Sequence, residues 1–190
     1  MKYRQGLVTS SSGLGLALTL ALLGGLATPA EAKVFYSQNE ALELAFPEAD
    51  RIERDAHILQ PQQVAAVEKR ARARLDSRIV TLYSGWRGEE LLGYAYIDIH
   101  TVRTLPEAFM VVLDPDGQVR SLRVLAFHEP LDYMPTDRWY GQFENKTGAE
   151  PLRLGKDIHG IMGATLSARA ASDSVRRVLA IYEILVRTEG

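Results

Sequence analysis

A glycine-containing segment, residues 157–169, holds the residues of this sequence with the clearest potential for chemistry. Gly160 and Gly163 permit a tight turn and a close approach of the backbone to a ligand. Directly after them an amphipathic pattern begins, which predicts a helix. The start of a helix offers unpaired N–H groups and a partial positive charge, and both suit a phosphate group. The local pattern therefore permits a phosphate site at the start of a helix.

A simpler interpretation of the same segment is a helix cap. The hydroxyl of Thr165 or of Ser167 can accept a hydrogen bond from an N–H group of the first turn. Glycine-rich loops with such a cap also precede helices that bind nothing. The local pattern alone favours the cap, so the phosphate site is a hypothesis at this point.

Other side chains that could contact a cofactor have structural alternatives. His128 and Glu129 could contact a bound ring or phosphate, or could form a turn. His57 and His100 show no metal-ligand spacing, so we expect neither to bind a metal. Some further side chains could stack on a ring or belong to the core: Tyr133, Met134, Trp139 and Tyr140.

Strands are predicted ahead of this segment, where the hydrophobic pattern changes to a period of two at Arg78. The tetrapeptide Asp114-Pro115-Asp116-Gly117 predicts a turn, because proline presets φ and glycine accepts a positive φ. The runs on its two sides should therefore form an antiparallel hairpin. The predicted strands are residues 79–83, 91–99, 108–113 and 119–127.

Helices are predicted on both sides of the strands. Ser37 and Glu40 form a capping box, Pro61 fits the first turn of a second helix, and Thr136 can cap a short helix. After Thr165 the apolar residues recur at spacings of three and four: Ala171, Val175, Val178, Leu179, Tyr182, Leu185 and Val186. This order predicts an α+β fold, with helices packed against one antiparallel sheet.

The bulk composition excludes several classes of function. The 190-residue chain has no cysteine, which excludes disulfides, Cys-ligated zinc, iron–sulfur clusters and thioether-linked haem. The formal net charge of -2 gives no basic field, so we expect no nucleic-acid partner.

The first residues of the chain predict export. Lys2 and Arg4 precede an uncharged run from Gly13 to Leu26, and Ala30-Glu31-Ala32 gives the small-residue frame of a cleavage site. A membrane anchor is the alternative, but the run is shorter than the ~20 residues of a spanning helix. We therefore expect a signal peptide over residues 1–32 and a periplasmic or extracytoplasmic location.

Gly163-Ala164-Thr165-Leu166-Ser167 resembles the signature of the FMN-binding domain family, which includes flavin subunits of Rnf- and Nqr-type complexes and the exported domain of NosR-type proteins. The resemblance implies FMN joined through its phosphate to the hydroxyl of Thr165, by a magnesium-dependent flavin transferase. Two positions depart from the family pattern, because its Asp falls on His159 and its first Ser/Thr on Met162. Noncovalent FMN and no flavin at all are the alternatives.

The resemblance covers residues 93–185 and includes the 112–119 hairpin and the segments around His128 and Trp139. Together with the N-terminus it implies a signal peptide (1–32), an N-terminal helical lead-in (33–77) and an FMN-binding domain (78–190). The residues expected to bind the cofactor are Met162, Gly163, Ala164, Thr165, Leu166, His128 and Glu129.

The function that follows from the resemblance is electron transport between a membrane redox complex and another carrier. A binding or sensory module of the same fold, docked on a membrane partner without flavin, is the first alternative. A flavin-dependent reductase with its own substrate is the second, and nothing in the sequence names that substrate.

Export gives the first testable prediction. N-terminal sequencing of the protein from its native compartment should begin at Lys33 or within a few residues of it. Recovery of the uncleaved chain in the membrane would contradict this and indicate an anchor.

Overall fold

The computed structural model describes residues 33–102 and 105–187, and the expected signal peptide lies outside them. One six-stranded antiparallel sheet has the order β1-β6-β5-β4-β3-β2. This confirms the predicted α+β fold. The strands are β1 (Lys33–Val34), β2 (Arg51–Ile58), β3 (Ile79–Arg87), β4 (Glu90–Val102), β5 (Leu105–Leu113) and β6 (Val119–Phe127).

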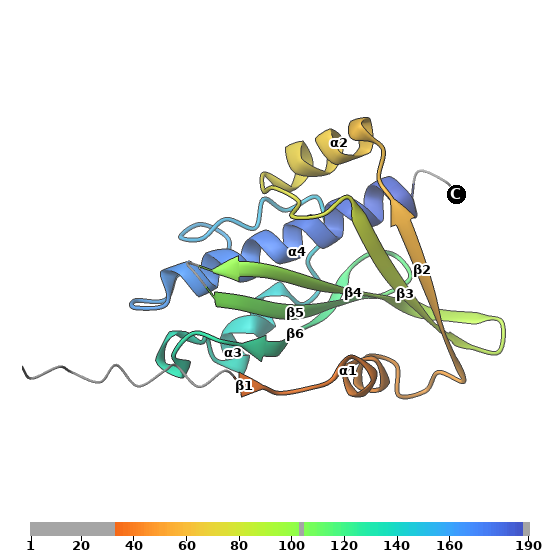
Figure 1. Cartoon of the computed structure of the whole chain (residues 1–190), viewed down its shortest axis with the longest axis horizontal. Coiled ribbons are helices and arrows are strands. Elements are labelled where there is room, and N and C mark those ends of the chain that lie inside the picture. Colours follow the sequence, from red (N-terminus) through yellow and green to blue (C-terminus); the bar gives the residue numbers. More distant parts are fainter. Residues whose placement is uncertain (1–32, 103–104, 188–190) are drawn as a thin grey trace, which may run out of the picture.

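Helices cover both faces of this sheet (Figure 1). Helix α1 (Gln38–Ala45) lies on one face, and the long helix α4 (Thr165–Leu185) crosses the other. Helix α2 (Pro61–Ala71) packs on the outer side of α4. The short helix α3 (Asp137–Tyr140) follows β6, between the 3-10 turns η1 (Leu131–Tyr133) and η2 (Gly141–Phe143).

Local sequence signals fix the start of several of these elements. The Ser37 hydroxyl accepts a hydrogen bond from Glu40 N, and the Glu40 carboxylate accepts one from Ser37 N, which confirms the capping box. Thr136 caps α3 as expected. In the β5–β6 turn, Asp114 Oδ1 accepts hydrogen bonds from the N–H groups of Asp116 and Gln118 at 3.0 and 2.8 Å. The predicted hairpin is therefore confirmed.

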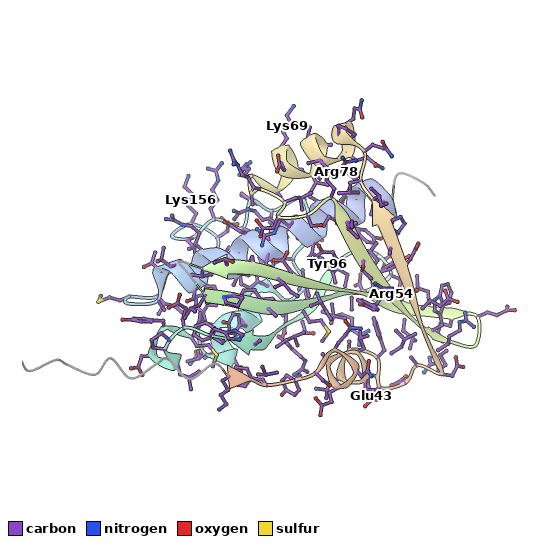
Figure 2. The ribbon with its side chains drawn as sticks, in the orientation of Figure 1. Glu43, Arg54, Lys69, Arg78, Tyr96 and Lys156 are labelled. Carbon is purple, nitrogen blue, oxygen red and sulfur yellow. The ribbon has the colours of Figure 1, made fainter. Side chains whose placement is uncertain are left out.

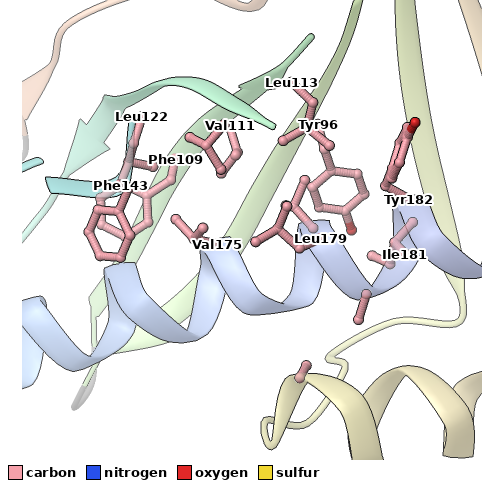
Figure 3. Close-up of a cluster of buried hydrophobic side chains, with 14 of the residues drawn as sticks. Tyr96, Phe109, Val111, Leu113, Leu122, Phe143, Val175, Leu179, Ile181 and Tyr182 are labelled. Atoms are coloured by element: carbon pink, nitrogen blue, oxygen red, sulfur yellow. The ribbon is translucent and has the colours of Figure 1, made fainter. Parts of the chain in front are cut away.

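The main core lies between α4 and the sheet (Figure 3). Val175 and Leu179 point from α4 toward aromatic and aliphatic side chains of the strands. Val175, Leu179 and Tyr182 are 0%, 2% and 6% exposed, so the predicted buried face of this helix is confirmed. Complete burial of one such aliphatic side chain contributes roughly 1.5–3 kcal/mol. This face therefore holds α4 in place along its length.

A second core, on the opposite face, lies under α1. Ala41, Leu42 and Phe46 pack there against Met110 and neighbouring residues of the central strands. The charged side chains labelled in Figure 2, such as Glu43 and Lys69, point away from both cores.

No helix within the described ranges is long and apolar enough to span a membrane.

The region expected to be a helical lead-in, residues 33–77, also contributes β1 and the eight-residue strand β2 to the sheet. The prediction of helices alone was therefore incomplete. Strand β2 pairs with β3 from Arg51 to Ile58 and forms an edge of the sheet. Its sequence alternates polar and apolar residues except at Arg54, but most of its side chains are exposed on both faces.

Gly117 gives a stability prediction. It has a φ of +83°, and a Cβ added there would overlap the ring of Tyr182, whose hydroxyl donates to Pro115 O at 2.9 Å. Gly117→Ala should therefore incur about 1–2 kcal/mol for the left-handed backbone and a further ~1–3 kcal/mol for the overlap. Urea denaturation measures the loss.

Gly155→Ala is the matched control, because Gly155 has a φ of +77° and a Cβ there would meet nothing within 4 Å. It should lose only the backbone contribution. Equal losses for the two variants would show that the contact between Tyr182 and the turn does not constrain the fold.

Candidate functional site

A small pocket lies at the N-terminal end of α4. Figure 1 shows this end of the helix beside the end of β4. The volume of the pocket is about 180 Å³. We call it the α4 pocket, and its lining residues are Val102, Glu129, Tyr133, Gly163, Ala164, Thr165, Leu166 and Ser167. The fold thus brings Glu129 together with the 163–166 segment, as expected. Met162 and His128, also expected to bind the cofactor, do not line the pocket.

Thr165 is the first residue of α4 but does not cap it. The cap position is Ala164, which offers no side-chain hydrogen bond. The exposed Thr165 hydroxyl donates only a long hydrogen bond, 3.4 Å, to Ile161 O, and Ser167 is buried in the pocket wall. The expectation that Thr165 or Ser167 caps the helix is therefore wrong. The Thr165 hydroxyl lies at the pocket with no capping role.

The first turn of α4 presents its N–H groups without a side-chain cap. The first hydrogen bond of the helix joins Ala168 N to Ala164 O at 3.0 Å. Within the described chain, the N–H groups of residues 165–167 have no hydrogen-bond partner, and the first turn carries no acidic residue. Unpaired N–H groups and the positive end of the helix dipole favour an anion at this position.

The loop that leads into α4 is exposed and shaped by Gly163. That residue has a φ of +88°, and a Cβ there would meet nothing within 4 Å. Glycine is therefore favoured at this position by backbone conformation, not by lack of space. The neighbouring Met162 side chain is fully exposed, and Leu166 is 41% exposed. The Thr165 side chain is thus accessible to a second protein.

Two contacts from the α3 region position this loop. Trp139 Nε1 donates to His159 O at 2.7 Å, and His159 N donates to Gln142 Oε1 at 2.8 Å. Trp139 and Tyr140 are buried in the core, so the alternative that they are core residues is the one the structure supports. Tyr133, in contrast, lines the pocket and is 39% exposed.

Glu129 and His128 have different roles although they are adjacent. Glu129 is 8% exposed, and among the described residues its Oε1 atom has no hydrogen-bond partner. An unpaired acceptor in the wall of a pocket can receive a hydrogen bond from a ligand. His128 Nδ1 instead lies 2.7 Å from Pro106 O, across the β5–β6 pair. His128 therefore fits the structural alternative.

A row of buried ionisable side chains that was not expected from the sequence lies under α4. Asp98 and His100 of β4, Glu107 of β5 and Arg177 of α4 are all less than 8% exposed. Arg177 Nε donates to Asp98 Oδ1 at 3.2 Å, and His100 Nδ1 lies 3.1 Å from Asp98 Oδ2. The detectable signal was polar residues at alternate positions of β4, on the face that also presents Tyr96.

The electrostatics of this row are dominated by burial and ion pairing. Burial alone would raise the pKa of Asp98, but hydrogen bonds from His100 and Arg177 lower that pKa to about 2. Burial alone would lower the pKa of His100, whereas the carboxylates of Asp98 and Glu107 raise it to about 8. Within residues 33–102 and 105–187, no three acidic or histidine side chains are arranged to hold a metal ion.

Comparison with known proteins adds no family. No protein-family model matches the sequence, and no curated protein matches it significantly. The choice of function therefore depends on the α4 pocket and on the sequence signature at its rim.

The raised pKa of His100 predicts that stability depends on pH. Its folded-state pKa is above the ordinary value of 6.5, so the stabilisation is fully present below that pH and is lost as the pH rises through about 8. Asp98 does not contribute in this window, because its stabilisation is lost only as the pH falls from 3.8 toward 2. The stability advantage of wild type over His100→Gln should shrink by on the order of 1–2 kcal/mol between about pH 6 and 9.

Urea denaturation at a series of pH values measures this difference. His159→Gln, in the exposed loop, is the matched control and should follow wild type. An advantage over His100→Gln that stays constant across the window would contradict the raised pKa.

Proposed function

We propose that the protein is an exported FMN-binding electron carrier, with the cofactor attached through a phosphoester to Thr165. The observation that carries this proposal is the hydroxyl of Thr165. It lies at the rim of the α4 pocket, at the start of a helix, and has no capping role. The sequence 163–167 around it resembles the attachment signature of FMN-binding domains.

The first turn of α4 fits a phosphate. Its unpaired N–H groups can donate to phosphate oxygens, and the helix dipole favours a negative charge there. Arg169 is exposed one turn after Thr165, and residues four apart on a helix share a face. A phosphoester on Thr165 would therefore have two sources of positive potential nearby.

The other lining residues fit part of a flavin. The volume of about 180 Å³ is below the roughly 300–1,000 Å³ of pockets that enclose a drug-sized ligand. A noncovalent flavin would therefore be held weakly, whereas a covalent bond retains it without deep burial. Glu129 Oε1 can accept a hydrogen bond from a ribityl hydroxyl or from the ring N–H group. Tyr133 and Leu166 supply apolar surface.

The chain does not activate its own hydroxyl. A threonine hydroxyl is a weak nucleophile that needs an adjacent base or metal. Among the described residues, the only hydrogen bond of the Thr165 hydroxyl is to a backbone carbonyl. An external flavin transferase would supply the metal and base, and the exposed 162–166 loop gives it access. When bound, the flavin supplies the redox chemistry, and the protein orients it and sets its electrostatic surroundings.

The expected partners follow from this attachment. A flavin transferase must act on the chain in the compartment where it folds, which agrees with the expected signal peptide and periplasmic location. Electrons would come from a membrane redox complex or another carrier. A tethered cofactor cannot diffuse away between encounters with such partners.

A second candidate function is supported by the apolar side chains near the pocket. Met162 is fully exposed, and Leu131, Tyr133 and Leu166 are 46%, 39% and 41% exposed. Such residues could instead form the docking surface of a flavin-free binding or sensory module on a membrane partner. Colour separates the two candidates, because only the carrier would be purified as a yellow protein.

Thr165 variants test the attachment. In a host with an active flavin transferase, wild type and Thr165→Ser should give a fluorescent band on a denaturing gel under ultraviolet light. Thr165→Ala should give none, because it lacks the hydroxyl. Its stability should stay within ~0.5 kcal/mol of wild type, since this exposed side chain makes only one long hydrogen bond.

Ser167→Ala is the matched control, because Ser167 is a second aliphatic hydroxyl side chain that lines the pocket, and it should keep the fluorescence. A wild-type band without fluorescence would rule out covalent attachment in that host. The double variant His159→Asp, Met162→Ser restores the family pattern. If it gained fluorescence, the two departures would be the cause.

A further inference from the structure

Among the described residues, Glu107 is a fully buried ionisable side chain that the proposed function does not use. Its side chain is 0% exposed, and within the described residues neither carboxylate oxygen has a hydrogen-bond partner. Removing an unpaired carboxylate from water costs several kcal/mol. A residue with only a packing role could be apolar at this position without that cost. The side chain therefore needs an explanation other than packing.

The side chain that faces Glu107 from β4 is His100. The two residues are cross-strand partners, and His100 Nε2 lies 3.8 Å from Glu107 Oε2, within ion-pair distance but too far for a hydrogen bond. The other ring nitrogen of His100 lies 3.1 Å from Asp98, and Asp98 is paired with Arg177. Arg177 and Asp98 cancel in charge. Glu107 and His100 are therefore neutral together only when they hold one proton between them.

The groups around this pair cannot easily take that proton. From α3, the buried hydroxyl of Tyr140 has no hydrogen-bond partner among the described residues, and burial raises its pKa, with Glu107 adding to the effect. From α4, the Arg177 guanidinium stays charged. Asp98 stays ionised, and Phe109, 5.2 Å from the His100 ring, is apolar. The proton is thus confined to His100 and Glu107.

The pair lies close to the α4 pocket. Along the same face of β4 and β5, the next cross-strand pair is Val102 and Leu105, and Val102 lines the pocket. Residues two apart in a strand are separated by about 7 Å. At this distance inside a protein, charges still interact, because the intervening medium screens them less than water does.

We propose that His100 and Glu107 form a buried one-proton site that gains proton affinity when a phosphate anion occupies the α4 pocket. The proton comes from solvent and converts neutral imidazole to imidazolium. By linkage, the protonated pair strengthens anion binding by the same factor. The inference rests on the proposed function only in naming the phosphate of FMN as the natural anion.

The first test uses the flavin-free full chain. The His100 ring resonance, identified by its loss in His100→Gln, is followed by NMR against pH. Glu107→Gln should lower the midpoint, because the imidazolium loses its carboxylate partner. Thr165→Glu should raise the midpoint by about half a pH unit at low salt relative to Thr165→Gln, and high salt should reduce that shift.

Circular dichroism is used as the control that each variant folds. The inference is overturned if Glu107→Gln leaves the midpoint unchanged, or if the two Thr165 variants titrate alike at low salt. Neither result depends on whether the protein binds flavin.

The second test uses free FMN, with riboflavin as the uncharged control, and Thr165→Ala to exclude covalent attachment. Quenching of flavin fluorescence should show a severalfold tighter affinity for FMN at pH 6 than at pH 9. This pH dependence of affinity should be absent for riboflavin, and it should be smaller for FMN binding to the double variant Thr165→Ala/His100→Gln. Equal pH dependence with and without His100 overturns the inference and leaves the proposed function standing. If FMN binds at neither pH, free FMN has no noncovalent site here; covalent attachment is then judged by the denaturing gel, and the comparison of Thr165→Glu with Thr165→Gln decides this inference.

Discussion

The buried ion pair between Arg177 and Asp98 fixes the long helix α4 on the sheet. Both side chains are less than 8% exposed, so each charge depends on the other for compensation. Removal of one partner from such a pair typically costs 3–5 kcal/mol. Hydrophobic burial is non-directional, whereas the hydrogen bonds of this ion pair have a defined geometry. The pair therefore adds a specific contact to the apolar packing that positions α4, and with it Thr165.

The α4 pocket depends on the position of this helix, and hydrogen bonds near both ends of α4 help to hold it. At the C-terminal end, Tyr182 binds the β5–β6 turn through Pro115 O. At the N-terminal end, Trp139 holds the loop at His159 O. Between His159 and α4, the Met162 side chain is fully exposed, and a Cβ at Gly163 would meet nothing within 4 Å. A helix start packed on the core beside an exposed loop would suit the proposed attachment site, which a transferase would modify and a redox partner would approach.

The sequence was sufficient for elements whose pattern reflects burial. Helix α4 and the β5–β6 hairpin have strong periodicity and turn chemistry, and both were predicted, although β5 begins at Leu105 and not at Ala108. The pocket could be predicted only in part, because Glu129 approaches Thr165 through the tertiary fold. His128 was expected beside it, but its bond to Pro106 O depends on strand pairing that local sequence does not encode. The same is true of Glu107. Its sequence context indicates an ordinary surface residue, and only the pairing of β5 with β4 brings it opposite His100.

Strand β2 was not predicted although polar residues alternate along one of its faces, and these polar residues have a consequence for the whole molecule. As an edge strand of eight residues, it leaves backbone donors and acceptors open to pairing with another chain. Arg51 and Glu53 pair along one side at 2.8 Å, and Asp55 and His57 at 3.0 Å. A second strand would have to bury these charges to dock. The charged face of β2 thus discourages the open sheet from assembling edge to edge into aggregates.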